Sequence, residues 1–365
     1  MKVPFLDVSQ TYFRISSEID SAIDEVLKSG HYILGGEVDQ FEHEWAKFCS
    51  SSYAVSVGNG LDALKLSLLA VGVEPNDEVL VPAHTYIASW LAISLVGAVP
   101  VPVDSNPYTY NIDVSKLENA LTRKTRVVMP VHLYGVPADM SEITKFARAH
   151  NLKIVEDAAQ AHGASYRGRK IGSIGDAVAW SFYPSKNLGC FGDGGAVTTN
   201  SEEIFERVKL LRNYGSQKRF HNEIIGYNSR LDPIQAAVLR TKLKHLENWN
   251  QKRTQIANKY LSSLGDTGIV LPAQSTDSTS SWHLFVIRHQ ERDRMQKFLA
   301  EREIETSIHY PTAIFDQPAY NNLDLDRSQY QIAREIAATS LSLPIGPHLE
   351  NEAVEKVCSV LFDFK

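Results

Sequence analysis

The sequence predicts an α/β protein, with a large and mostly parallel sheet followed by a small α+β domain. Short β-rich runs alternate with helical patterns through residues 53–198, and this alternation is typical of a parallel sheet covered by helices on both faces. A long helical pattern then follows Pro233, and a polar loop at residues 273–280 leads into the last part of the chain. The length of 365 residues suits about two domains. We therefore predict a large domain at residues 1–245 and a small C-terminal domain at residues 246–365.

The elements of the first part are expected from local patterns. Strands are expected at residues 53–57, 78–81, 100–103, 126–131, 153–155, 178–182 and 195–198. Helices are expected at residues 17–28, 61–68, 112–121 and 140–150. In the C-terminal part we expect strands at residues 281–288 and 306–309 and helices at residues 295–301, 330–338 and 350–362. Because ligands of such sheets bind beyond the carboxyl ends of the strands, the functional residues are expected there.

Composition excludes several classes of protein. The 37 Lys and Arg residues against 43 Asp and Glu give a net charge of −6, which offers no attraction to nucleic acid or to an anionic membrane. No apolar run reaches the ~20 residues of a membrane-spanning helix, and the charged N-terminus does not resemble a signal peptide. Three distant cysteines, Cys49, Cys190 and Cys358, fit neither a disulfide framework nor a zinc site. We expect a soluble cytoplasmic protein with no metal, no nucleic-acid partner and no membrane partner.

Two side chains that could carry chemistry follow expected strands. Asp157 comes directly after the strand at residues 153–155, where a carboxylate either caps a helix or serves a ligand. Lys186 lies in a loop between Ser181 and the glycine-rich segment 192–195. Its amine is either a solvated surface charge or a nucleophile for a carbonyl carbon. The neighbouring glycines favour a ligand, because glycine allows close approach of the backbone.

A third motif, Gly58-Asn59-Gly60, joins a strand to a helix. Free backbone N–H groups at a helix N-terminus bind phosphate, although Asn-Gly is also a common turn. It is neither a Walker loop nor a complete dinucleotide fingerprint. No set of histidines has the spacing of a metal site. A phosphate site, a carboxylate and a reactive lysine together are what pyridoxal phosphate requires.

These motifs resemble those of the DegT/StrS group of sugar aminotransferases, which have the aspartate-aminotransferase fold (PLP fold type I). The resemblance covers nearly the whole chain. It rests on Pro4-Phe5-Leu6-Asp7, Gly58-Asn59-Gly60, Pro82-Ala83-His84-Thr85-Tyr86, Glu156-Asp157-Ala158-Ala159-Gln160, the segments 181–186, 192–195 and 226–231, His309-Tyr310-Pro311 and Ser342-Leu343-Pro344. Lys186 separates the chain from similar dehydratases, which carry His at that place.

The resemblance implies a role for each cofactor-binding residue. Lys186 and Asp157 would be catalytic, with Lys186 bonded to the cofactor and Asp157 paired with the pyridine nitrogen. The other expected contacts are Gln160 to the ring hydroxyl, Tyr86 stacked on the ring, Gly60, Leu61 and Ser181 around the phosphate, and Asn228 reaching the phosphate of a neighbouring subunit. A homodimer with shared active sites is therefore expected. Many relatives have Thr where this chain has Leu61, so a backbone contact must suffice there.

The resemblance also implies the substrates. L-Glutamate would donate the amino group to C-3 of a nucleotide-linked 3-keto-6-deoxyhexose, giving a dTDP-3-amino-3,6-dideoxyhexose for polysaccharide biosynthesis. Tyr183, His309 and Tyr310 would line the sugar pocket, and Lys218 or Arg219 would meet the diphosphate. Three alternatives stay open: a UDP-linked 3-keto uronic acid as substrate, amination of a 4-keto sugar, and a non-catalytic regulator that binds pyridoxal phosphate.

Overall fold

The computed structural model describes residues 1–218, 220–265 and 267–364. Its main sheet has seven strands in the order β1-β9-β8-β5-β4-β2-β3. The strands are β1 (Tyr53–Val57), β2 (Glu78–Pro82), β3 (Val99–Val103), β4 (Thr125–Val128), β5 (Lys153–Asp157), β8 (Ala177–Ser181) and β9 (Gly195–Thr199). The central strands pair in parallel, and β9 is antiparallel to β1 and β8. The predicted α/β class and mostly parallel sheet are confirmed.

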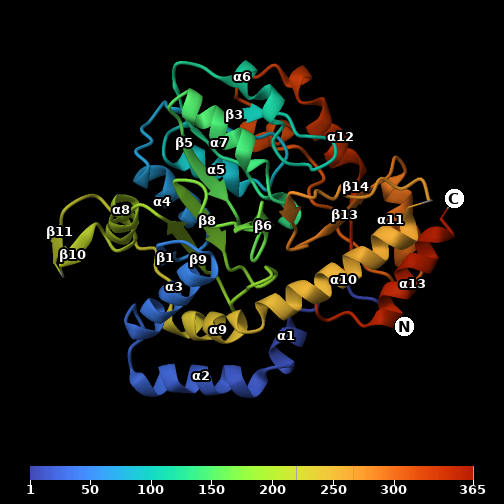
Figure 1. The fold of residues 1–365 in the computed structure, drawn as a ribbon, viewed down its shortest axis with the longest axis horizontal. Helices are drawn as coiled ribbons and strands as arrows, with labels where there is room; N and C mark the ends of the chain where they lie inside the picture. Colours follow the sequence, from blue (N-terminus) through green and yellow to red (C-terminus); the bar gives the residue numbers. More distant parts are fainter. Residues whose placement is uncertain (219, 266, 365) are drawn as a thin grey trace.

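Helices cover both faces of the sheet because successive strand residues point to opposite sides (Figure 1). Ile154 packs with α3 (Gly36–Phe48), α7 (Met140–Ala149) and α9 (Pro233–Leu243). The next residue, Val155, packs on the other face. The helices on that face are α4 (Gly60–Ala70), α5 (Ala88–Leu95) and α8 (Glu202–Arg212). Near-continuous apolar strands buried on both faces are typical of parallel sheets.

The C-terminal part has its own hydrophobic core, which also contains Val3 from the N-terminus. Its elements are α10 (Leu246–Leu264), β13 (Phe285–Arg288), α11 (Arg292–Ala300), α12 (Gln331–Thr339), β14 (Ser340–Leu343) and α13 (Asn351–Phe362). In Figure 1 the long helix α10 runs away from the sheet, and both termini lie near α13. The domain boundary at residue 245 stays a prediction, which the start of α10 at Leu246 supports.

One expected strand of this part is absent among the described residues, and one strand was not expected. Residues 306–309 form no strand, and Ser307 makes only an isolated bridge to Ser342. The strand that pairs with β13 is β14, in the antiparallel register Phe285↔Leu343. The strand β14 follows α12 directly, without a turn between them, so no turn residue marks its beginning.

The remaining elements are short or peripheral. Helix α2 (Ser16–Ser29) packs on α9 through Ile19 and Val238. The expected helix at residues 112–121 is a 3₁₀ turn, Val114–Lys116, followed by α6 (Leu117–Ala120). The others are α1 (Ser9–Phe13), β6 (Ser165–Tyr166), β7 (Arg169–Lys170), β10 (Ser216–Lys218), β11 (His221–Asn222), β12 (Ser278–Thr279) and 3₁₀ turns at Leu133–Gly135, Ile314–Asp316, Pro318–Tyr320 and Arg327–Gln329.

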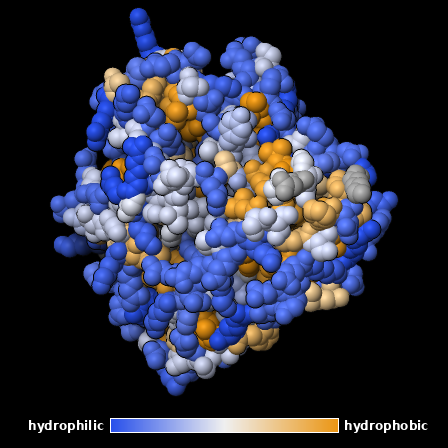
Figure 2. Space-filling model, turned by 45° about the vertical axis from the view of Figure 1, so that its right-hand side comes forward, coloured by the Kyte–Doolittle hydropathy of each residue, from blue (hydrophilic) through white to orange (hydrophobic). Residues whose placement is uncertain are grey.

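Figure 2 shows a mostly hydrophilic face on which apolar side chains form separate patches. Among the helices that the structure describes, none combines the length and the hydropathy that crossing a membrane requires.

Candidate active site

The candidate site lies at the carboxyl ends of β5 and β8, as the fold predicts. Asp157 is the last residue of β5, and only 6% of it is exposed. Its Oδ2 accepts a hydrogen bond from the Ser89 hydroxyl at 2.8 Å, and its Oδ1 accepts one from the Ala159 N–H at 3.1 Å. The segment after Asp157 consists of turns. Asp157 is therefore a buried carboxylate at a strand end and not a helix cap.

Lys186 lies in the loop after β8, in front of Asp157. Among the residues that the structure describes, none forms a hydrogen bond or ion pair with the Lys186 amine. Burial lowers the pKa of Lys186 to about 8, and the Asp157 carboxylate opposes that effect. Burial also raises the pKa of Asp157, while Ser89, the Ala159 N–H and the Lys186 charge lower it. The Lys186 amine thus lies in a partly desolvated site and loses its proton more readily than an exposed lysine does.

The loop that carries Lys186 is anchored directly after the lysine. The Asn187 amide donates to Asn250 Oδ1 at 2.9 Å and to the Ser281 carbonyl at 2.8 Å. A Cβ on Gly189 would lie 2.5 Å from the carbonyl oxygen of Pro184. The backbone therefore folds back on itself so tightly that only glycine fits at position 189.

A compact anion site is built where α4 begins. Asn59 caps the helix by accepting the Asp62 N–H at 2.8 Å. The N–H groups of Gly60 and Leu61 have no hydrogen-bond acceptor among the described residues. A Cβ on Gly60 would lie 2.6 Å from the Cβ of Ser181, so the absence of a side chain lets the two segments meet. Two free N–H groups, a hydroxyl and the helix dipole together suit a phosphate.

Four further predicted residues surround the space in front of Asp157. Gln160 Nε2 donates to the Tyr310 hydroxyl at 3.0 Å. The rings of Tyr310 and Tyr86 lie 5.4 Å apart, and 54% of Tyr86 is exposed. The ring of His309 hydrogen-bonds Ser342 Oγ at 2.8 Å, and burial lowers the pKa of His309 to about 4. Burial also raises the pKa of Tyr310, so this hydroxyl stays protonated.

The predicted substrate residues are less concentrated. Tyr183 is exposed, next to Ser181, whose hydroxyl accepts the Tyr183 N–H at 3.3 Å. Lys218 and Asn228 are also exposed, at the hairpin of β10 and β11 and just after it. Figure 1 shows this hairpin projecting from the body beyond α8. Arg219 lies outside the described residues. The structure thus brings the other predicted cofactor residues of one chain together. Lys218 and Asn228 are instead exposed, on the hairpin and in the segment after it.

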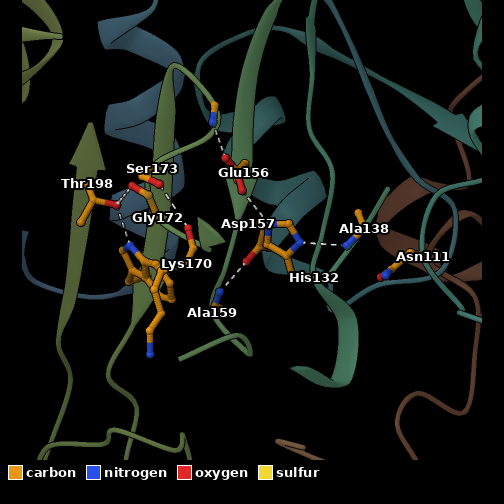
Figure 3. A network of polar contacts seen from close by, with 12 residues as sticks. Asn111, His132, Ala138, Glu156, Asp157, Ala159, Lys170, Gly172, Ser173 and Thr198 are labelled. Carbon is orange, nitrogen blue, oxygen red and sulfur yellow. Dashed lines mark hydrogen bonds and ion pairs between the residues drawn. The ribbon is translucent and has the colours of Figure 1, made fainter. Parts of the chain in front are cut away.

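Several site residues could not be recognised from sequence. Ser89 reaches Asp157 from α5, and the Tyr134 N–H holds Gln160 Oε1 at 2.7 Å. Figure 3 shows a third group, in which His132 bridges the residue beside Asp157, Glu156, and the backbone of Ala138. These contacts join segments far apart in sequence. The adjacency of Glu156 to Asp157 was the one signal available.

The residues present fit pyridoxal phosphate. The free N–H groups at α4 match its phosphate, and the buried Asp157 matches a protonated ring nitrogen. The Lys186 amine, unpaired among the described residues and with a lowered pKa, matches its aldehyde. Each group offers the charge or hydrogen-bonding type that this cofactor needs at that place.

Comparisons with known proteins agree with this reading. The chain is 50% identical over 357 residues to "dTDP-3-amino-3,4,6-trideoxy-alpha-D-glucose transaminase" of Streptomyces venezuelae, covering 98% of this chain and 94% of that protein. It is 49% identical over 355 residues to "dTDP-3-amino-3,6-dideoxy-alpha-D-galactopyranose transaminase" of Aneurinibacillus thermoaerophilus, covering 97% of each.

Solved structures show the same fold over the whole chain. S. venezuelae DesV, crystallised "in complex with ketimine intermediate", superposes with a TM-score of 0.98 at 49% identity, covering 99% of this chain and 98% of that one. A Bacillus subtilis structure "with bound cofactor pmp" has a TM-score of 0.92 at 33% identity, covering 99% and 84%. The model of the DegT/DnrJ/EryC1/StrS aminotransferase family matches residues 14–362. The chain therefore belongs to the DegT/DnrJ/EryC1/StrS aminotransferase family.

Proposed function

We propose that this pyridoxal-phosphate-dependent aminotransferase moves an amino group from L-glutamate to C-3 of a nucleotide-linked 3-keto-6-deoxyhexose. The product would be a dTDP-3-amino-3,6-dideoxyhexose used in polysaccharide biosynthesis. The observation that carries the proposal is the Lys186 amine, which faces the buried carboxylate of Asp157 and has no partner among the described residues. Both transaminases at 49–50% identity are named for 3-amino sugars, which supports C-3 as the site of amination.

The bound cofactor supplies an aldehyde for amines and a ring that accepts electrons from the substrate carbon. Asp157 holds a proton on the ring nitrogen, since its burial makes an opposite charge there strongly favourable. The Lys186 amine lies beside the place where the cofactor would bind, so its Nζ would take up a proton as a base and release it again as an acid. Its lowered pKa of about 8 suits both roles near neutral pH.

The other residues bind and orient. Gly60, Leu61 and Ser181 hold the phosphate, and Gln160 donates a hydrogen bond at the ring hydroxyl. Tyr86 covers the ring, and its exposure supports a position on the substrate side. We assign Tyr183, His309 and Tyr310 to the sugar, because they surround the open side of the site. These roles rest on the geometry above together with the family resemblance.

We further propose a homodimer in the cytoplasm. Ile225, which follows the β10–β11 hairpin, is 93% exposed, and an apolar side chain on a projecting segment suits a protein partner. Asn228 and Lys218 lie nearby along the chain, so a second copy would receive them at its own site. All three cysteines are free and buried, which supports a reducing compartment.

The first test is the visible absorption spectrum of the purified protein with pyridoxal phosphate, before and after L-glutamate. We expect a band from the lysine-bound cofactor that disappears when glutamate donates its amine. Lys186→Ala is expected to lack the band. Candidate 3-keto and 4-keto nucleotide sugars then follow, with the product's C-3 or C-4 amine located by NMR. A band that glutamate leaves unchanged would contradict the donor, and the lack of any band in the wild type would favour a non-catalytic protein.

The rate of cofactor incorporation is expected to depend on pH. Lys186 attacks the aldehyde only as the neutral amine, and its pKa is lowered to about 8. The rate should therefore rise with pH around a midpoint near 8, so that at pH 7 it is about a tenth of its maximum. Stopped-flow absorbance on the cofactor-free protein measures this. A midpoint above pH 10, the range of an ordinary lysine, would show that the amine is not desolvated.

Gly60→Ala is expected to weaken binding of the cofactor. The added methyl would meet the Ser181 Cβ at 2.6 Å and push the phosphate-binding N–H groups away from Ser181. We expect the dissociation constant to rise at least ~10-fold, as for loss of a charged hydrogen bond. Gly265→Ala is the control, because a Cβ there meets only the Leu261 carbonyl at 3.8 Å. Equal affinities of the two variants for the cofactor, measured by fluorescence titration, would show that the phosphate does not bind at the start of α4.

Ile225→Asp is expected to shift the protein from dimer to monomer. A buried charge at the proposed interface would cost more than the association gains. Light scattering measures the mass, and cofactor affinity should fall with it if Asn228 serves the partner's phosphate. Phe362→Asp is the control, because Phe362 is also exposed but lies on α13. A wild-type protein that is monomeric at micromolar concentration would rule out the homodimer.

A further inference from the structure

A fully buried acid–histidine pair lies directly behind the site and has no role in the chemistry above. His132 Nε2 and Glu156 Oε2 are 2.7 Å apart, and both side chains are 0% exposed. Glu156 Oε1 also accepts the N–H of Gly175. Figure 3 shows the pair beside Asp157, with His132 between Glu156 and Ala138. Burying a carboxylate is costly, so its placement here needs an explanation.

The direction of each hydrogen bond in this pair follows from one backbone group. The Ala138 N–H can only donate, and it lies 3.0 Å from His132 Nδ1. His132 Nδ1 is therefore an acceptor, and Nε2 carries the ring proton and donates it to Glu156. The imidazole thus closes the turn at residues 132–138 through Nδ1 and ties that turn to Glu156 on β5 through Nε2. The His132 N–H adds a third tie, to the Asp157 carbonyl at 3.0 Å.

The same turn fixes the amide of Gln160. Tyr134 has a left-handed φ of +60°, and its N–H donates to Gln160 Oε1 at 2.7 Å. Because a backbone N–H cannot accept, the oxygen of the amide faces Tyr134 and its NH₂ group faces the site. Gln160 Nε2 accordingly donates to the Tyr310 hydroxyl at 3.0 Å. Because the Tyr310 hydroxyl oxygen accepts this bond, its O–H proton can be donated to a ligand.

The turn also reaches the residues around the sugar side. The Tyr134 hydroxyl donates to the His309 carbonyl, and His84 Nε2 lies 2.9 Å from the same hydroxyl. Tyr134 is 2% exposed. One buried turn therefore sets the orientation of Gln160 and contacts the segment that carries His309 and Tyr310.

We propose that Glu156 and His132 are positioning residues that hold this turn so that Gln160 and Tyr310 both present hydrogen-bond donors to the cofactor and substrate. The proposal rests on the proposed function, because it assumes that Gln160 meets the ring hydroxyl. A donor at the ring hydroxyl would stabilise negative charge on that oxygen. It would thereby make the Lys186 nitrogen, where it is attached to the cofactor, less basic. The pair acts through Gln160 without touching the cofactor.

The test is the pH midpoint of the visible absorbance change of the bound cofactor, without substrate. Gln160→Leu removes the donor and should raise the midpoint by about one pH unit, as for loss of one charge-assisted hydrogen bond. His132→Phe should raise it by a similar amount. The double variant should shift it no further than Gln160→Leu alone, since coupled residues are not additive. An unchanged midpoint in His132→Phe, or fully additive shifts, would overturn the proposal.

Two milder variants cover a failure of His132→Phe to fold. His132→Asn keeps an acceptor for the Ala138 N–H, and His132→Gln keeps a donor for Glu156. Each should give a partial rise in the midpoint, with thermal unfolding of the cofactor-free protein confirming that it is folded. An unchanged midpoint in both folded variants would also overturn the proposal.

A surface pair of the same kind provides the matched control. His150 Nε2 and Glu118 Oε1 are 2.8 Å apart, and 65% of the Glu118 side chain is exposed. His150→Phe should leave the midpoint at the wild-type value. A shift equal to that of His132→Phe would show that any lost histidine has this effect. If the wild type itself gives no cofactor absorbance, the proposed function fails; if it titrates normally and His132→Phe matches it, only the positioning role fails.

Discussion

The parallel pairing of β5 with its neighbours is the constraint on which the site depends. β5 pairs with β8 in the register Asp157↔Ala179 and with β4 through Val128↔Ile154. This register brings the end of β5 next to the end of β8, so the loop with Lys186 begins beside Asp157. An isolated parallel bridge between Val131 and Asp157 continues the ladder past the end of β4. A slip by one residue would turn Asp157 to the other face of the sheet.

Burial then sets the charges at this edge of the sheet. It lowers the pKa of Lys186 and Lys242 to about 8 and that of Arg253 to about 10. Burial likewise lowers the pKa of His84 to about 4 and that of His162 to about 3. Both imidazoles are therefore neutral at physiological pH, and His84 acts as a hydrogen-bonding group toward the Tyr134 hydroxyl. Asp157 is left as the carboxylate that interacts with the Lys186 charge, and its negative charge would favour a protonated ring nitrogen of the cofactor.

Local patterns explain why much of the fold could be predicted from sequence. Strand and helix periodicity identified the seven strands of the sheet, and Asp157 and Lys186 stood out because they follow two of them. Gly58-Asn59-Gly60 was recognised as a possible phosphate site between a strand and a helix, and the family resemblance added Gln160 and the C-terminal residues. Contacts between distant segments left no such signal. Neither the φ of Tyr134 nor the direction of the Gln160 amide can be deduced from neighbours in sequence, because both depend on where the turn meets β5.

The two sides of the site differ in how firmly they are held. On the cofactor side, Asp157, Gln160 and Asn187 each hydrogen-bond to backbone groups of the loops beside the sheet, which fixes the orientation of these side chains. On the open side, Tyr86 and Tyr183 have about half of their surface exposed, at 54% and 55%. Neither side chain takes part in these buried hydrogen bonds, so we expect a substitution there to leave them in place. This separation gives a physical reason why one scaffold can keep the same amine chemistry while its sugar substrate varies.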